Sequence, residues 1–163
     1  MKVPAHLLGF WNDFRRAAGG VDEARFYEAF CFGDSEALAN GLAALVLQGA
    51  KRATAASVWA FEAEARGMPR PGDLSIVTSW AIEPLCVIQT RAVDIVRFAD
   101  VSAEFAALEG EGDGSLAFWQ ESHQAYFTRE CERIGRQFSE DMPVACERFE
   151  VVYRSTTFGN AHV

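Results

Sequence analysis

Lysine is rare in this sequence, and one lysine stands three residues before a threonine. Of the fifteen Lys and Arg residues only two are lysines, Lys2 and Lys51, the second in the stretch GAKRATAAS. Arginine stays charged in proteins, whereas a desolvated lysine can lose its proton and act as a base or nucleophile. A neighbouring hydroxyl such as that of Thr54 can then be activated for attack. Chance retention of one lysine in an arginine-rich chain is the competing interpretation.

The two side chains can share a site only if the chain bends between them. Residues three apart on an extended strand point to opposite faces of the sheet. Gly49 and the small residues that follow it permit a turn before a strand begins. In the simpler alternative, Thr54 is the first β-branched residue of that strand and has no chemical role.

A second candidate region is the acidic stretch EGEGDGSLAFW, residues 109–119. Glu109, Glu111 and Asp113 occupy the first, third and fifth positions of an EF-hand loop, but the twelfth position is Gln120, whose amide cannot supply the bidentate carboxylate. We therefore predict no calcium site. The cysteines and histidines lie too far apart for metal-ligand spacing, so we predict no metal and no cofactor.

The size and charge of the chain exclude several classes of partner. A chain of 163 residues corresponds to one domain. Its net charge of −8 argues against the broad cationic surface that double-stranded DNA requires. The longest apolar run, LAALVL, is too short to span a bilayer. We expect a cytoplasmic protein with no membrane partner.

The hydrophobic pattern favours an α+β fold. Helical periodicity predicts helices around residues 7–14, 22–33, 34–49, 102–110 and 116–135, and period-two alternation with β-branched residues predicts strands over 73–80, 83–98 and 144–153. Helices before and within a run of strands favour a small, mostly antiparallel sheet flanked by helices. We expect one domain over residues 1–155 and a flexible C-terminal tail over 156–163.

Three stretches together resemble a known family: FGDSEALANGLAALVLQGAKRATAAS, EGEGDGSLAFWQESHQAYF and CERFEVVY. They are similar to the larger bacterial ASCH-domain proteins, relatives of the PUA-like RNA-binding fold, and the resemblance runs from about Phe10 to Tyr153. It implies a small twisted antiparallel β-barrel with flanking helices and a cleft lined by both central motifs. It also implies an activity, because some small ASCH proteins are amidohydrolases that remove an acyl group from the exocyclic amine of cytidine.

By this resemblance the catalytic residues are Lys51 and Thr54 of GAKRAT and Glu109 of AALE. Thr54 would attack the acyl carbon while Lys51 takes its proton, or Lys51 would stay charged on the carbonyl oxygen while Glu109 activates water. We favour the base role. The amidohydrolases with these residues are shorter and lack the EGEGDGS extension. Other members are linked to single-stranded RNA binding or cleavage, which is the alternative function.

Eight further residues are candidates for substrate binding: Arg52, Ser57, Glu111, Asp113, Ser115, Trp119, His123 and Tyr126. Arg52 would contact a phosphate. Ser57 is better suited to cap the helix that follows it, whereas Ser115 is equally suited to cap its helix or to bind a ligand. The aromatic rings of Trp119, His123 and Tyr126, which share one helix, could stack a base or belong to the core. The expected partner is a small-molecule nucleoside or single-stranded RNA, and the acidic balance favours the nucleoside because it carries no phosphate.

Overall fold

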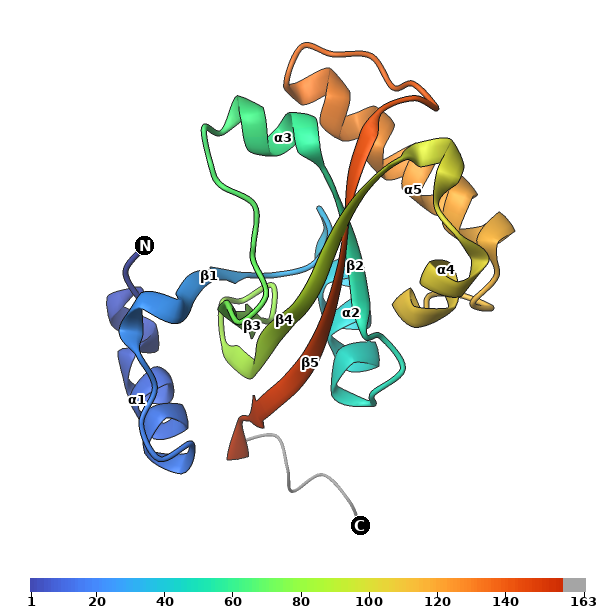
Figure 1. The fold of residues 1–163 in the computed structure, drawn as a ribbon. Helices are drawn as coiled ribbons and strands as arrows, with labels where there is room; N and C mark the ends of the chain where they lie inside the picture. Colours follow the sequence, from blue (N-terminus) through green and yellow to red (C-terminus); the bar gives the residue numbers. More distant parts are fainter. Residues whose placement is uncertain (157–163) are drawn as a thin grey trace.

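The computed structural model describes residues 1–156 (Figure 1). Short 3₁₀ turns cover Ala5–Leu7, Glu23–Arg25 and Phe98–Asp100. The helices are α1 (Leu8–Ala17), α2 (Glu36–Leu47), α3 (Val58–Ala63), α4 (Ala103–Glu109) and α5 (Leu116–Arg133). The strands are β1 (Phe26–Phe30), β2 (Ala53–Ser57), β3 (Leu74–Thr78), β4 (Pro84–Arg97) and β5 (Pro143–Arg154). Residues 157–163 of the predicted flexible tail lie outside the described residues.

The strands form one mixed sheet with the order β1-β3-β4-β5-β2. The β1–β3 pair is parallel, and the other neighbours are antiparallel. Strands β4 and β5 form its long central ribbon, paired from Cys86 opposite Arg154 to Arg97 opposite Pro143. The predicted α+β class and the mostly antiparallel sheet are confirmed. Across the described residues the sheet is open, with β1 and β2 as its edges, so the predicted closed barrel is not observed.

One predicted helix is wrong. The stretch from Asp22 to Gly33 shows aromatic residues at helical spacing, yet Phe26–Phe30 forms strand β1. Aromatic residues also favour strands, and here backbone pairing with β3 decides between the two. Phe26 then packs edge-on against Trp11 of α1, with ring centroids 5.2 Å apart.

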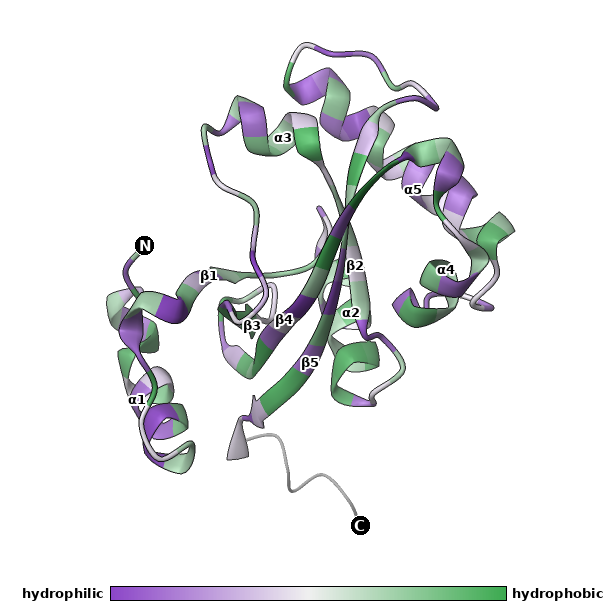
Figure 2. Ribbon diagram, viewed as in Figure 1, coloured by the Kyte–Doolittle hydropathy of each residue, from purple (hydrophilic) through white to green (hydrophobic). Residues whose placement is uncertain are grey.

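The other predicted helices and strands are confirmed, and serine side chains cap several helices. Ser57, Ser102 and Ser115 accept hydrogen bonds from the backbone N–H three residues on, at the starts of α3, α4 and α5. Green and purple residues alternate along α1 and along the β4–β5 ribbon, as expected for elements with one buried and one exposed face (Figure 2).

The helices cover the sheet in separate groups. α1 lies at one end of the sheet, and its Trp11 and Phe14 pack against residues of β1 and β3 (Figure 1). α4 and α5 lie together on the other side of the β4–β5 ribbon, where Trp119 and Phe127 form a core with Met142. Within residues 1–156 no helix is both long and apolar enough to cross a membrane.

Candidate active site

Lys51 lies in the bend that joins α2 to β2. Gly49 adopts a positive φ of 79° just after the end of α2, and the backbone N–H of Lys51 donates to Leu45 O at 3.1 Å. The chain then straightens into β2 at Ala53. This is the bend that the sequence required for Lys51 and Thr54 to face one site.

The glycine after Glu109 brings a second segment against this bend. Gly110 ends α4 in the left-handed conformation, with φ of 64°, and a Cβ there would lie 2.1 Å from Ala50 O. Any other residue would push the two segments apart. The N–H of Arg52 also donates to Leu108 O at 2.8 Å. Close approach at Gly110 therefore places the carboxylates on either side of it beside Lys51.

The ammonium group of Lys51 is fully buried and fully hydrogen-bonded. Its Nζ donates to Glu111 Oε1 at 2.8 Å, to Ala53 O at 2.8 Å and to Glu109 Oε1 at 3.2 Å. The side chains of Lys51 and Glu109 are each 1% exposed, and that of Glu111 is 14% exposed. An ammonium has three N–H groups. All three of these donors are used, and Glu111 is the partner nearest to solvent.

The other carboxylate oxygen of Glu109 is held from helix α5. Trp119 donates its indole N–H to Glu109 Oε2, and His123 Nε2 lies 3.0 Å from the same atom. The two rings stack with centroids 4.2 Å apart. His123 Nδ1 lies 2.9 Å from Trp119 O. An ionised carboxylate only accepts, so His123 Nε2 is the donor to Glu109, while Nδ1 lies between the Trp119 carbonyl and the Ser122 hydroxyl.

The charges in this cluster hold one another in the ionised state. Burial acts to lower the pKa of Lys51, but the opposing charges of Glu109 and Glu111 outweigh it and raise that pKa. Burial likewise acts to raise the pKa of Glu109, but Lys51 and the His123 hydrogen bond lower it to about 2. Burial acts to lower the pKa of His123, but the hydrogen bond and the charge of Glu109 outweigh it and raise that pKa. We call Lys51, Glu109, Glu111 and His123 the charge cluster.

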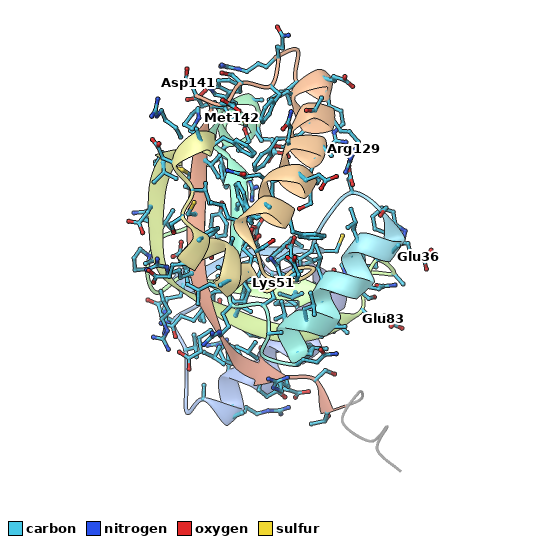
Figure 3. All side chains as sticks on the ribbon, turned by 90° about the vertical axis from the view of Figure 1, so that its right-hand side faces the viewer. Glu36, Lys51, Glu83, Arg129, Asp141 and Met142 are labelled. Carbon is cyan, nitrogen blue, oxygen red and sulfur yellow. The ribbon has the colours of Figure 1, made fainter. Side chains whose placement is uncertain are left out.

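The charge cluster forms the inner wall of a cavity of about 430 Å³, within the size range of small-molecule sites, about 300–1,000 Å³. Figure 3 shows Lys51 in the interior of the molecule and Arg129 on the outer side of α5. Of the predicted site residues, the cavity is lined by Lys51, Thr54, Ser57, Glu109, Glu111, His123 and Tyr126. Phe30, Phe32, Leu38 and Leu42 add an apolar wall.

Thr54 lines the cavity but does not touch Lys51 through a hydrogen bond. Its hydroxyl makes no hydrogen bond to any side chain or backbone group of residues 1–156, whereas Lys51 Nζ turns to Ala53 O and the two carboxylates. The predicted contact between Lys51 and Glu109 is confirmed. A threonine already hydrogen-bonded to lysine is not observed.

Four predicted substrate-binding residues lie outside the cavity wall. The Arg52 side chain is exposed and does not line the cavity. Asp113 accepts from the N–H of Ser115 at 2.9 Å, and Ser115 caps α5. Trp119 is buried behind Glu109. Ser115 is thus a helix cap and Trp119 a core residue, which were the alternatives to substrate binding.

The cavity holds a further carboxyl group that was not predicted from the sequence, that of Glu147 in β5. Its neighbours in the alternation, Ala145 and Phe149, share its face of the strand, and both are buried. An acid in an otherwise apolar row was the available signal. Burial raises the pKa of Glu147 to about 7, and the Thr90 hydroxyl donates to its Oε1 at 2.6 Å.

Glu109, Glu111 and His123 each offer a ligand atom within 4.8 Å of the others, a spacing that could hold a metal ion. Lys51 Nζ already bonds both carboxylates, so a cation would have to displace the ammonium. Leaving the buried ammonium without these partners would be costly. The absence of a metal remains a prediction.

A family model described as the ASCH domain matches residues 28–153, which include every residue of the cavity wall named above. The chain belongs to the ASCH-domain family. This ASCH domain is a PUA-like module. It is similar to the crystal structure of an ASCH domain from Lactobacillus crispatus JV V101, with 36% identity over 93% of this chain and 97% of that chain, at a TM-score of 0.84. A protein structure from Enterococcus faecalis V583 is 31% identical over 96% of each chain, also at 0.84. No curated protein sequence matches the chain.

Proposed function

We propose that this ASCH domain is an amidohydrolase that removes an acyl group from the exocyclic amine of a modified cytidine. The observation that carries the proposal is the buried Lys51–Glu109 pair on the wall of a cavity that Thr54 also lines. These are the three residues that the family resemblance assigns to catalysis. A cavity of this size that combines an apolar wall with convergent polar groups suits a nucleoside.

In the proposed reaction Thr54 is the nucleophile and Lys51 supplies positive charge. The Thr54 oxygen bonds to the acyl carbon, and the carbonyl oxygen becomes an oxyanion beside Lys51. The raised pKa of Lys51 argues against the base role favoured from the sequence, because a base must first lose its proton. With a pKa of about 2, Glu109 is also a weak base, and it serves instead to fix Lys51 in place.

The saturated ammonium adds a condition to this mechanism. Because all three Lys51 donors are used, a substrate oxygen must replace one acceptor. Glu111 is the partner closest to solvent, and it stands between two glycines with positive φ, Gly110 and Gly112. Substrate binding would therefore release Lys51 from Glu111, while Glu109 and Ala53 keep its position.

Single-stranded RNA binding is the second candidate, and the PUA-like character of the domain supports it. The charge balance supports it less. Arg129 at the cavity donates to Asp34 at 2.9 Å, and Arg66 is bonded to Glu28, so both cations are already paired with carboxylates. Phosphate binding would have to break these pairs.

One experiment separates the two candidates. Purified protein is incubated with N4-acetylcytidine and, in parallel, with a single-stranded RNA oligonucleotide, and products are followed by chromatography. We expect release of cytidine, intact RNA, and a loss of about 100-fold or more in Thr54→Val. Thr54→Ser should retain part of the activity because it keeps the hydroxyl. Thr128→Val, on the far turn of α5, is the matched control. RNA binding or cleavage with intact acetylcytidine would overturn the amidohydrolase proposal.

A further inference from the structure

Two groups of the charge cluster are poor proton carriers near neutral pH. The pKa of Lys51 is raised above its ordinary high value, and the pKa of Glu109 is lowered to about 2. The ring nitrogens of His123 lie beside Glu109 Oε2 and Trp119 O and form no hydrogen bond to Thr54. Hydrolysis of an amide nevertheless requires two proton movements, one away from the attacking oxygen and one onto the departing nitrogen. A group beside Thr54 would be best placed to accept and return these protons.

Glu147 stands directly across the sheet from Thr54. In the antiparallel β2–β5 pair, Thr54 is the register partner of Glu147. Directly opposite residues point to the same face, with Cβ atoms about 5 Å apart. Both side chains line the cavity. The Thr54 hydroxyl is free of hydrogen bonds to the described residues, and the Glu147 carboxyl holds one, from Thr90.

We infer that Glu147 is the acid–base group of the site: its carboxylate accepts the Thr54 proton during attack and returns it to the leaving amine. This inference rests on the proposed amidohydrolase function and adds a residue to it. The Thr54 oxygen forms a bond to the acyl carbon as its O–H bond breaks. When the C–N bond breaks, the nitrogen takes the proton from Glu147. Water then attacks the acyl-threonine, gives a proton to Glu147, and Thr54 leaves with that proton.

The surroundings of Glu147 suit a group that gains and loses a proton. Burial is the main cause that raises its pKa to about 7, and the nearby charges of Glu28 and Asp73 act in the same direction. The Thr90 hydrogen bond and the charge of Lys51 act to lower it. A value near the working pH is the one at which a carboxyl group serves best in both directions.

A further titratable group faces Glu147 from strand β1. Burial is the main cause that raises the pKa of Tyr27 to about 12, and the charge of Glu147 acts in the same direction. Tyr27 therefore stays neutral in the working range. Glu28, on the same strand, is bonded to Arg66, which stacks on Tyr27. Within the described cavity wall Glu147 is therefore the carboxyl that lies opposite the nucleophile and lacks a cationic partner.

The test is the pH dependence of acetylcytidine hydrolysis in Glu147→Gln. The amide keeps the size of the side chain and can still accept from Thr90. We expect kcat to fall about 100-fold or more with little change in KM. In the wild type kcat/KM should decline as pH falls through about 7, because a protonated Glu147 cannot accept the Thr54 proton. That decline should be absent from the residual activity of Glu147→Gln.

A second variant shifts the same profile without removing the carboxyl group. Thr90→Val deletes the hydrogen bond that lowers the Glu147 pKa, so the acidic limb should move to higher pH. Glu150→Gln is the matched control, because Glu150 is an exposed acid of the same strand, paired with Arg91. Full activity of a folded Glu147→Gln with an unchanged profile would overturn the role of Glu147 alone. Absence of turnover by the wild type would overturn the amidohydrolase and this role together.

Discussion

The two walls of the cavity treat buried carboxyl groups in opposite ways. On one wall Glu109 meets Lys51, Trp119 and His123, and its pKa falls to about 2. On the other wall Glu147 meets a single hydroxyl, and burial raises its pKa to about 7. Burial acts to raise the pKa of both carboxyl groups, so burial is not what distinguishes them. What differs is the presence of a cation within hydrogen-bonding distance.

This difference separates two kinds of work that a hydrolytic site requires. A group whose charge is fixed can orient its neighbours and stabilise a developing charge. A group whose charge is easily lost can carry a proton. The same residue type serves both purposes because strand register and helix packing decide what stands beside it.

The largest effect should come from removing the cation of the charge cluster. Lys51→Met leaves Glu109 and Glu111 without their buried ammonium, and breaking a buried ion pair costs about 3–5 kcal/mol. We expect the free energy of unfolding in urea to fall by that amount and acetylcytidine hydrolysis to be lost. Arg97→Met, which breaks exposed pairs with Asp100 and Asp141, should leave the free energy of unfolding nearly unchanged. Equal losses in the two variants would contradict the contrast between the buried and the exposed pair.

The next effect separates the two walls by pH. Glu147 has a pKa of about 7 in the folded protein against an ordinary 4.5, so the folded state binds its proton more tightly. Its contribution to stability is full below pH 4.5 and is lost as pH rises through about 7. The wild type should therefore lose about 3 kcal/mol relative to Glu147→Gln between pH 4.5 and 7.5.

The comparison of these two variants isolates Glu147. Glu109 has a pKa of about 2 and stays ionised over that range, and the titration of His123 is common to both proteins. Unfolding in urea across a pH series gives the two curves. Parallel curves would show that Glu147 is ionised in the fold, and the two walls would then be alike.

The wall with Lys51 and Glu109 could be predicted from the sequence, whereas the wall with Glu147 could not. Lys51 and Glu109 follow local signals: a helix that ends at a glycine, and an acid that ends another helix before a glycine. The contact between them follows from the family motifs. Glu147 depends on which residues β5 meets on β2 and β4, and pairings between distant segments carry no local signature.

The same physical reason explains the errors in the fold. Strand β1 was predicted as a helix because its aromatic spacing fits both structures, and only its pairing with β3 decides. The capped helices and the long strands β4 and β5 were predictable because caps and alternation are local. Saturation of all three Lys51 donors was not predictable, because one of them binds a backbone carbonyl.

The smallest effect concerns how tightly the first wall holds Glu109. Trp119→Phe keeps the stacked aromatic core with His123 and removes the indole N–H that donates to Glu109 Oε2. Loss of one donor to a buried carboxylate costs about 1–3 kcal/mol. The Glu109 pKa should rise, because a hydrogen bond to the ionised form is lost. The stability that Glu109 contributes is present above pH 4.5 and is lost as pH falls toward 2, so in Trp119→Phe acid unfolding should begin at higher pH. Circular dichroism from pH 7 to pH 2 measures the midpoint, and Trp59→Phe, a partly buried tryptophan of α3, is the matched control. An unchanged midpoint would mean that Lys51 and His123 suffice to keep Glu109 ionised, and that the contrast between the two walls does not depend on the indole.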